Sequence, residues 1–262
     1  MNHAKPLLFA VALASLTLPA CTGATGEVEE QADTAEEQDV TSNALSFNAL
    51  SFNALSFNAL SFNALSFNGL QSDALLRESL KDPNARQVLK YVVSCALPAS
   101  ESISVTVQGT EFDFPGGLGL APEWGEPHGS CGSSCQHWVS ACVISRLDFL
   151  GKRTEISLRG DNDALDTSRA ERGTFTAREA TYYGDIFVEP QRLFACLSPG
   201  KTEIPRVCGP SIRGCGVDVL GSCDKLCGQP RLDGSFPDCR VPGGPRQKDE
   251  VFHAAVTVFL DP

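Results

Sequence analysis

The residues of this chain with the most chemistry to offer are its cysteines, of which there are 11 in 262 residues. Cys21 follows an apolar N-terminal run, and without it the other cysteines are even in number. In an oxidising compartment such a set predicts a disulfide framework, here of at most five bridges. The ten cysteines form two odd-numbered groups, so full oxidation requires at least one bridge between the groups. The first group is Cys95, Cys131, Cys135, Cys142 and Cys196, and the second is Cys208, Cys215, Cys223, Cys227 and Cys239.

Metal binding is the second chemistry that these thiols could support. Cys131/Cys135 and Cys223/Cys227 are two Cys-x3-Cys pairs, and four thiolates suit tetrahedral zinc. Zinc requires reduced cysteines, whereas the expected compartment oxidises them, so we predict neither a metal nor another cofactor. The run 161–166 begins like a calcium loop, but it has Leu165 at the fifth position and no glycine at the sixth, which favours an exposed turn.

Residues 129–138, Gly-Ser-Cys-Gly-Ser-Ser-Cys-Gln-His-Trp, resemble the nucleophile helix of papain-like cysteine proteases, and residues 253–256 resemble their histidine strand. The resemblance implies that Cys135 is a thiolate at a helix N-terminus and that His253 is its base. The motif is interrupted by an extra Ser and by Gln-His, it lacks the glutamine six residues before Cys135, and the nine residues after His253 leave no room for the orienting asparagine. We therefore favour a structural disulfide at Cys135. A free thiol there would instead favour the protease.

Residues 1–20 have the features of an export signal. Lys5 precedes an apolar run from residue 6 to 18, and about 13 residues are too few to cross the roughly 30 Å of hydrocarbon in a bilayer. The sequence Leu-Pro-Ala-Cys at 18–21 resembles the lipobox of bacterial lipoproteins, which implies that Cys21 is lipidated and that acyl chains attach the protein to membrane lipid. Ordinary secretory cleavage, leaving a free Cys21, is the alternative. Thr22 stands where retained inner-membrane lipoproteins carry Asp, so the resemblance favours the outer membrane.

The next segment, 21–42, is acidic. Between residues 22 and 41 there are seven Asp or Glu and no Lys or Arg, in a chain whose formal net charge is −11. Such a segment is expected to be a disordered, solvated linker. The chain has no basic footprint, so nucleic acid is excluded as a partner.

Residues 43–70 form a low-complexity repeat with five copies of Asn-Ala-Leu-Ser-Phe and a decayed sixth copy. On a helix five residues advance about 500°, and in a strand an odd period sends successive Phe residues to alternate faces, so neither structure gains an apolar side. A pentapeptide-repeat β-helix is the alternative, but it resembles Ala-Asn/Asp-Leu rather than Asn-Ala-Leu and needs more neighbouring repeats. We expect a disordered stalk.

Residues 71–262 have the composition of one disulfide-rich globular domain, which we assign to the α+β class with two or three helices and a mostly antiparallel sheet. Helices are predicted over 73–80, over a segment capped by Asp82 with Pro83 at its first position, and over 134–149. A hairpin is predicted for 103–114. Further strands are predicted at 155–159, 174–182, 185–188 and 251–260.

Cys135 and Cys142 are each expected to form a disulfide, but not with each other. They are seven residues apart in a predicted helix, which places their Cα atoms about 10.5 Å apart, beyond the limit of about 7 Å for a disulfide. Cys95, on the buried face of the preceding helix, is a candidate partner for one of them. A cysteine of the C-terminal group is allowed for the other.

Several motifs together resemble a family. The repeat behind a lipobox, Ser-Cys-Ala-Leu-Pro at 94–98, Cys-Gln-His-Trp-Val-Ser-Ala-Cys at 135–142, Tyr-Gly-Asp-Ile-Phe at 183–187 and the run 195–208 are similar to uncharacterised cysteine-rich lipoproteins of myxobacteria. The resemblance implies location and architecture but no activity. We therefore expect a lipid-anchored, non-enzymatic envelope protein with a structural, adhesive or binding role and an unspecified protein or glycan ligand. The alternative is a secreted hydrolase that resembles a degenerate papain-like protease.

Overall fold

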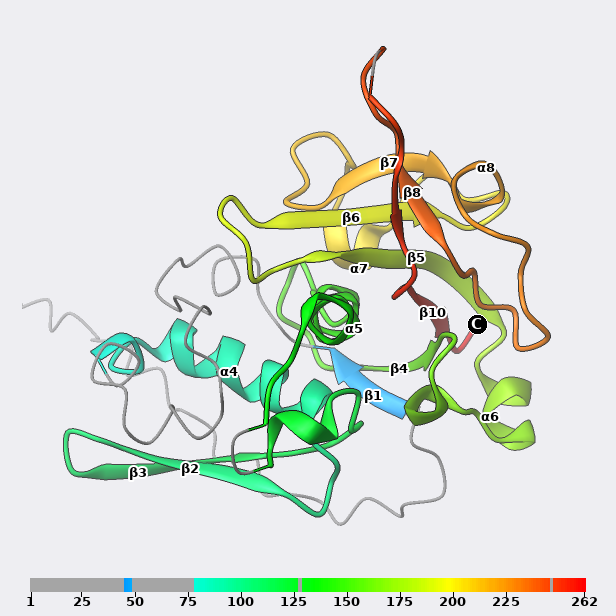
Figure 1. Ribbon diagram of the computed structural model, residues 1–262. Helices are drawn as coiled ribbons and strands as arrows, with labels where there is room; N and C mark the ends of the chain where they lie inside the picture. Colours follow the sequence, from blue (N-terminus) through cyan, green and yellow to red (C-terminus); the bar gives the residue numbers. More distant parts are fainter. Residues whose placement is uncertain (1–44, 49–77, 127–128, 246) are drawn as a thin grey trace, which may run out of the picture. The chain divides into compact units, whose positions relative to one another are not determined.

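The computed structural model describes residues 45–48, 78–126, 129–245 and 247–262, all of which belong to one compact unit, Val40–Pro262. Its architecture is α+β, as predicted, with a mostly antiparallel sheet (Figure 1). The described residues form five disulfides. The predicted signal 1–20, the linker 21–42, residues 73–77 of the helix predicted over 73–80 and most of the repeat lie outside the described residues.

The main sheet has six strands in the order β1-β4-β10-β5-β6-β7. All neighbouring pairs are antiparallel except β6 and β7, which are parallel. The other two sheets are the pairs β2-β3 and β8-β9. The strands are β1 (Leu45–Asn48), β2 (Ser102–Val107), β3 (Thr110–Pro115), β4 (Thr154–Arg159), β5 (Ala177–Asp185), β6 (Arg192–Leu197), β7 (Asp218–Ser222), β8 (Cys239–Val241), β9 (Glu250–Phe252) and β10 (Val256–Leu260).

The helix α4 (Pro83–Ala96) begins where the sequence predicted. The Asp82 side chain accepts a hydrogen bond from the Asn84 N–H at 2.7 Å, and Pro83 takes the first helical position, where its missing N–H costs nothing. One face of the helix is buried through Val88, Leu89, Val92 and Cys95. The helix ends before Pro98, which disfavours helical geometry at Leu97. This buried face is what carries Cys95 inward.

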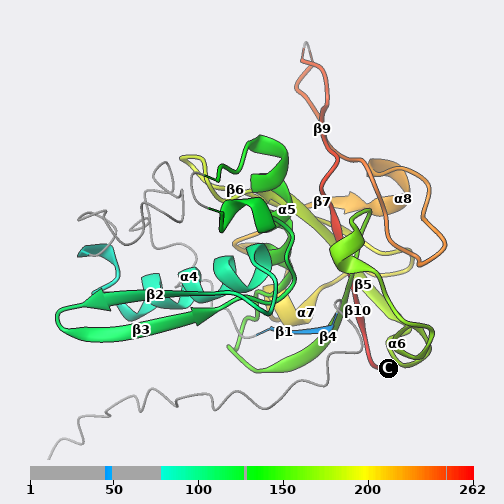
Figure 2. The same cartoon turned by 60° about the horizontal axis from the view of Figure 1, so that its bottom comes forward.

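The hairpin of β2 and β3 also agrees with the prediction. Gln108 and Gly109 both have positive φ, 52° and 84°, which is the backbone of a type I′ turn. Ile103, Val105 and Val107 are the buried residues of β2, and β3 contacts α4. Figure 2 shows the hairpin running alongside that helix.

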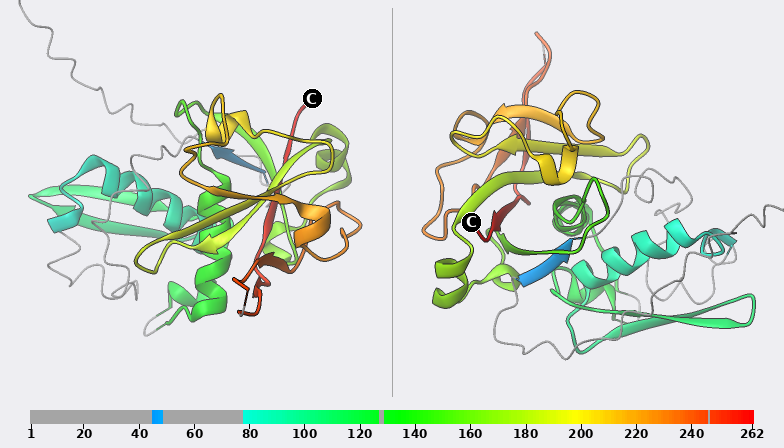
Figure 3. Two further views of the ribbon diagram at one scale, coloured as in Figure 1. Left: turned by 90° about the horizontal axis from the view of Figure 1, so that it is seen from above. Right: turned by 180° about the vertical axis from the view of Figure 1, so that it is seen from behind.

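The helix α5 (Ser133–Ser145) is shorter than the predicted 134–149. Its residues 139–145 are buried on every side, because α5 packs against β5 and β10 on one side and against α4 on the other (Figure 3). The helix ends where Asp148 accepts hydrogen bonds from the N–H groups of Leu150 and Lys152, which turns the chain away. Phe149 is therefore outside the helix, and its N–H donates to the Arg206 carbonyl.

Besides the two long helices there are three short ones, so the described residues contain more helices than the two or three expected. They are α6 (Arg169–Thr174), α7 (Pro205–Cys208) and α8 (Cys223–Leu226), and two 3₁₀ turns, η2 (Pro122–Trp124) and η3 (Asp163–Leu165), accompany them. Each is one or two turns long, too short to leave a hydrophobic period in the sequence.

The C-terminal strands differ from the prediction in three places. Of the strand expected at 185–188 only Asp185 is in a strand, as the last residue of β5, and the chain then bends, because the Asp185 carboxylate accepts a hydrogen bond from the Phe187 N–H. The strand expected over 251–260 is divided at 253–255 into β9 and β10, which belong to different sheets. The strands β6, β7 and β8 were not predicted. In β6 the apolar residues run continuously from 193 to 197, a pattern that does not alternate.

The repeat contributes one element that the sequence reasoning excluded. Residues 45–48, within its first two copies, form β1 and pair antiparallel with β4, with Leu45 opposite Ser157. The odd period only prevents the Phe residues of several successive copies from sharing one apolar face. It does not prevent four residues from adding their backbone to the free edge of β4.

Candidate functional site

In the structure Cys135 is not the free thiol that the protease resemblance implies. Cys135 is bonded to Cys131, four residues earlier, so it has no thiol to serve as nucleophile. His253 lies between β9 and β10 rather than in a strand, with its side chain 82% exposed and Nδ1 2.7 Å from an Asp238 carboxylate oxygen. This histidine therefore has an acidic partner of its own at the surface.

All ten cysteines within the described residues are paired. The Cys95–Cys142 disulfide joins α4 to α5, as the sequence allowed, and Cys135 and Cys142 are not joined to each other. The C-terminal partner that the sequence allowed for the second cysteine is not used, because Cys135 is bonded to Cys131, which lies just before α5 begins. The bridge required between the two groups is Cys196–Cys223. The full set is Cys95–Cys142, Cys131–Cys135, Cys196–Cys223, Cys208–Cys215 and Cys227–Cys239.

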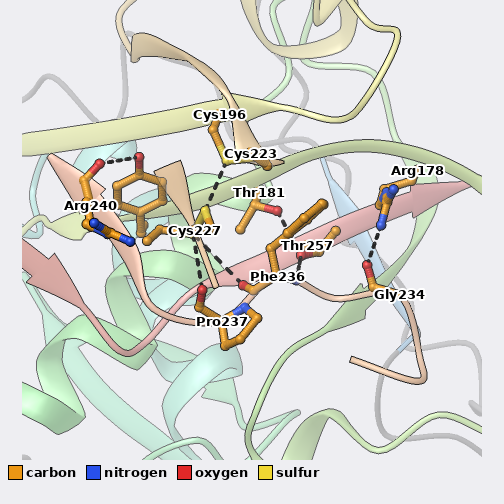
Figure 4. Close-up of a disulfide and its surroundings, with 12 residues drawn as sticks. Arg178, Thr181, Cys196, Cys223, Cys227, Gly234, Phe236, Pro237, Arg240 and Thr257 are labelled. Atoms are coloured by element: carbon orange, nitrogen blue, oxygen red, sulfur yellow. Dashed lines mark hydrogen bonds between the residues drawn. A yellow bond between two sulfur atoms is a disulfide. The ribbon is translucent and has the colours of Figure 1, made fainter. Parts of the chain in front are cut away.

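Two of these disulfides lie against each other, and we call Cys196–Cys223 together with Cys227–Cys239 the paired-cystine cluster (Figure 4). The Sγ atoms of Cys196 and Cys227 are 3.4 Å apart although they belong to different bridges. Cys196 comes from β6, Cys223 and Cys227 flank the single turn of α8, and Cys239 begins β8. The cluster therefore ties the main sheet to the segment that follows β7.

Hydrogen bonds to the sheet hold the segment of residues 234–240 beneath the cluster (Figure 4). The hydroxyls of Thr181 on β5 and Thr257 on β10 are 2.8 Å apart, and the Phe236 N–H donates to the Thr257 oxygen at 3.0 Å. The Arg178 guanidinium donates to the Gly234 carbonyl and lies 4.6 Å from the ring centre of Phe236. These contacts fix the loop that delivers Cys239 to its bridge.

The surroundings of the cluster are apolar and aromatic. Tyr183, Phe194, Phe236 and Phe252 are buried with its four cysteines. Burial raises the pKa of the Tyr183 hydroxyl, which donates instead to the Arg240 carbonyl. Such surroundings disfavour a persistent thiolate. The cysteines are accordingly suited to the neutral, bridged form.

As a metal site the cluster does not fit in its oxidised state. The Sγ atoms of Cys196, Cys227 and Cys239 lie within 4.8 Å of one another, a spacing near that of ligands around one ion. Zinc binds thiolates, however, and each of these sulfurs is already bonded to another sulfur. The other zinc set drawn from the sequence is divided among three bridges, because Cys131 binds Cys135 whereas Cys223 and Cys227 belong to different cystines.

The acidic run 161–166 is a turn, as predicted, and not a calcium loop. The Asn162 side chain accepts a hydrogen bond from the Ala164 N–H, Leu165 is buried, and Asp161 forms an ion pair with Arg231. A shallow hollow adjoins this turn, lined by Gly160, Asp166, Thr167, Arg172, Arg231 and Asp233.

A second polar cluster was missed by the sequence reasoning. His137 of α5 lies 3.5 Å from Asp185 at the end of β5, measured from Nε2 to the carboxylate. Beside them Arg192 and Glu250 form a two-pronged ion pair, and the His137 ring lies at a tilt against the Phe252 ring, with 4.9 Å between their centres. The hydrogen bond from Arg192 lowers the pKa of the Glu250 carboxyl, and His137 adds to this effect. His137 and Asp185 belong to two of the motifs that carried the family resemblance. Membership of those motifs is the sequence signal from which they could have been found.

A third polar cluster is internal. Glu179 accepts hydrogen bonds from the Arg206 guanidinium and from the Tyr182 hydroxyl, and Arg206 also donates to the carbonyls of Ser145 and Leu147. Burial alone lowers the pKa of Arg206, but the Glu179 charge outweighs it and the pKa rises. Burial and then Glu179 raise the pKa of Tyr182. The cluster joins α7 to β5 and to the end of α5.

No helix among the described residues is long and apolar enough to cross a membrane. No family, curated protein or solved structure matches this chain.

Proposed function

We propose that this chain is a lipid-anchored protein of a bacterial cell envelope, attached through acylated Cys21 at the outer membrane, and that its disulfide-locked domain works by binding or display rather than by catalysis. The lipobox at 18–21 is the sequence feature behind the anchor. The domain supplies an independent argument through its cysteines.

The observation that carries the proposal is the complete pairing of the cysteines that the structure describes. Five disulfides in a domain of this size are typical of exported proteins, because cytosolic thiols are kept reduced. The pairing uses every cysteine except Cys21. An odd cysteine behind an apolar N-terminal run is what a lipid anchor requires.

The non-enzymatic part of the proposal rests on the state of Cys135. Its bond to Cys131 removes the thiolate that the hydrolase alternative needs. If alkylation of the unfolded but unreduced protein labels Cys135, the hydrolase alternative gains support. If no label is found at this position, display or binding is favoured.

Fatty-acid labelling of the full chain, expressed in a bacterial host, tests the anchor. The natural chain should incorporate labelled palmitate and sediment with membranes, whereas Cys21→Ser should lose the label and leave the membrane fraction. A double variant, Cys131→Ser with Cys135→Ser, removes two other cysteines and should keep the label. Membrane retention of Cys21→Ser would contradict lipidation.

Density-gradient separation of the two membranes tests the proposed location. The natural chain should sediment with outer-membrane markers. Thr22→Asp places the retention residue next to Cys21 and should move the protein to the inner-membrane fraction, with Thr22→Ser as the matched control. Equal distribution of Thr22→Asp and Thr22→Ser would remove the argument for the outer membrane.

A further inference from the structure

The paired-cystine cluster places the sulfurs of two separate disulfides in contact. The distance between Sγ of Cys196 and Sγ of Cys227 is 3.4 Å, whereas disulfide-bonded sulfurs in this chain are about 2 Å apart. Thiol–disulfide exchange proceeds by attack of a thiolate on a disulfide sulfur. A free sulfur on Cys227 would thus already lie next to the sulfur that it must attack.

We propose that the paired-cystine cluster is a thiol–disulfide exchange site, in which Cys227–Cys239 accepts electrons from an external dithiol and passes them to Cys196–Cys223. This inference goes beyond the proposed anchoring role and does not depend on it. The substrate class is a dithiol reductant, which a small molecule or a protein can supply.

Burial decides which of the two disulfides meets the reductant. All four cysteines of the cluster are buried, but Cys196, Cys223 and Cys239 are fully so, whereas Cys227 retains 7% exposure. We take Cys227 as the sulfur that the reductant meets first. An external thiolate attacks Cys227 Sγ, the Cys227–Cys239 bond breaks, and its electron pair leaves on Cys239. The second thiol of the reductant then displaces Cys227 as a thiolate, and the reductant departs as a disulfide. Two electrons have entered the chain at this point.

The second stage is internal. The Cys227 thiolate attacks Cys196 Sγ, so a Cys196–Cys227 bond forms, the Cys196–Cys223 bond breaks, and Cys223 takes the electron pair and a proton. Cys239 then attacks Cys227, which restores Cys227–Cys239 and releases Cys196, which also takes a proton. The net change is oxidation of one dithiol to a disulfide and reduction of Cys196–Cys223 to two thiols.

The loop beneath the cluster can stabilise the reduced, thiol form of Cys239. The carbonyl oxygens of Phe236 and Pro237 lie 3.9 Å and 4.0 Å from Cys239 Sγ, where they can accept a hydrogen bond from an S–H group. The Phe236 N–H is held by Thr257 on the sheet. The loop that carries Cys239 is therefore fixed at a second point, which favours rebonding to Cys227.

One variant isolates the internal step. In the full chain Cys239→Ser leaves Cys227 without its partner, and exchange should move the free thiol to Cys223. Acid quenching, alkylation and peptide mapping should then recover Cys196 linked to Cys227, with the label on Cys223. The matched control is Cys215→Ser, which frees Cys208 of a separate disulfide and should be labelled at Cys208 alone. A label that stays on Cys227 in Cys239→Ser would overturn the proposal.

The natural protein provides a test that does not depend on how a variant folds. Treatment with less than one equivalent of dithiothreitol, or of a reduced dithiol protein in a parallel arm, should end with Cys196 and Cys223 alkylated and Cys227–Cys239 intact. Samples that are quenched early should contain the Cys196–Cys227 linkage with Cys223 and Cys239 alkylated. The arm that gives this peptide identifies the competent donor. If both arms alkylate only Cys227 and Cys239 while Cys196–Cys223 persists at all times, the two disulfides do not exchange and the proposal is wrong.

Discussion

The two halves of this domain are held together by different means. Among the described residues the larger core contains 38 buried residues, three of which are cysteines. It lies around α4, α5 and the face of the sheet that packs against α5. The smaller core, around β6, β8 and β9, contains nine, of which four are cysteines. Apolar packing is thus the main source of stability in the first region, whereas the second depends on the paired-cystine cluster.

The reason for this difference lies in chain composition. From residue 209 to 245 the sequence is rich in Gly, Pro and Cys, and β7 and β8 have only five and three residues. Elements this short bury too little apolar surface to offset the entropy of ordering their chain. Disulfides stabilise such a segment by restricting its unfolded state instead. The contrast predicts how each region responds when one contribution is removed.

The largest effect is expected from removal of the paired-cystine cluster. Replacing Cys196, Cys223, Cys227 and Cys239 by Ala opens loops of 27 and 12 residues, which should cost about 6 kcal/mol in the chain-entropy treatment. Hydrogen exchange should show loss of protection at 218–241 and retained protection in α4 and α5.

A matched control removes the bridge with the shortest loop. Replacing Cys131 and Cys135 by Ala opens a loop of four residues, which should cost about 2 kcal/mol in the same treatment. Protection of residues 218–241 that survives the four-cysteine variant would show that packing, not the cluster, holds the second region.

The next largest effect should come from the ion pair of Glu179 and Arg206. Glu179→Ala leaves a guanidinium whose side chain is only 7% exposed without its carboxylate, and loss of one partner of a buried pair typically costs about 3–5 kcal/mol. Denaturant unfolding should detect this loss. The double variant Glu179→Leu with Arg206→Met removes both charges and should recover much of it, since an apolar pair can replace a buried ion pair. A double variant as unstable as Glu179→Ala would contradict the interpretation.

A cavity in the larger core should cost a comparable or smaller amount. Leu89 on α4 is fully buried, and Leu89→Ala should destabilise the domain by about 2–5 kcal/mol through lost transfer free energy and a residual cavity. The control is Leu150→Ala, because Leu150 is 67% exposed and such a change usually stays within about 0.5 kcal/mol. Thermal unfolding compares the two. Equal effects would mean that α4 is not part of the stabilising core.

The same contrast explains what could be predicted from the sequence. The first region has caps, a turn and apolar spacing that are local, so α4, α5 and the β2-β3 hairpin were found, and Cys95 was placed facing α5. In the second region β6 has no alternation and β7 pairs in parallel with it, so pairing depends on contacts distant in sequence. Cysteine parity predicted that one bridge must cross between the groups but could not identify Cys196–Cys223. The contact between Cys196 and Cys227 is a tertiary feature with no local signal.

The exposed ion pair of Arg192 and Glu250 joins β6 to β9, two strands of the second region. Arg192 is at the start of β6 and lies over the rings of Phe194 and Phe252, with 5.4 Å to each ring centre. Both side chains are more than a third exposed, so solvent screens the pair and its contribution to stability should be only about 0–1 kcal/mol. The smallest of the predicted effects is therefore expected here.

The acid dependence of this pair gives the measurement. The Arg192 hydrogen bond lowers the pKa of Glu250 below its ordinary value of 4.5 in the folded protein. A carboxyl with a depressed folded pKa binds its proton more tightly in the unfolded state, so its contribution is complete above the unfolded value and is lost as the pH falls through the folded value. Glu250→Gln should slightly lower the free energy of unfolding at pH 7, and its difference from the natural protein should be smaller at pH 3. The exposed Glu203, changed to Gln, is the control for net charge. If Glu203→Gln gives the same difference between pH 7 and pH 3, the effect belongs to overall charge, and the contact between β6 and β9 rests on the packing of the Phe194 and Phe252 rings.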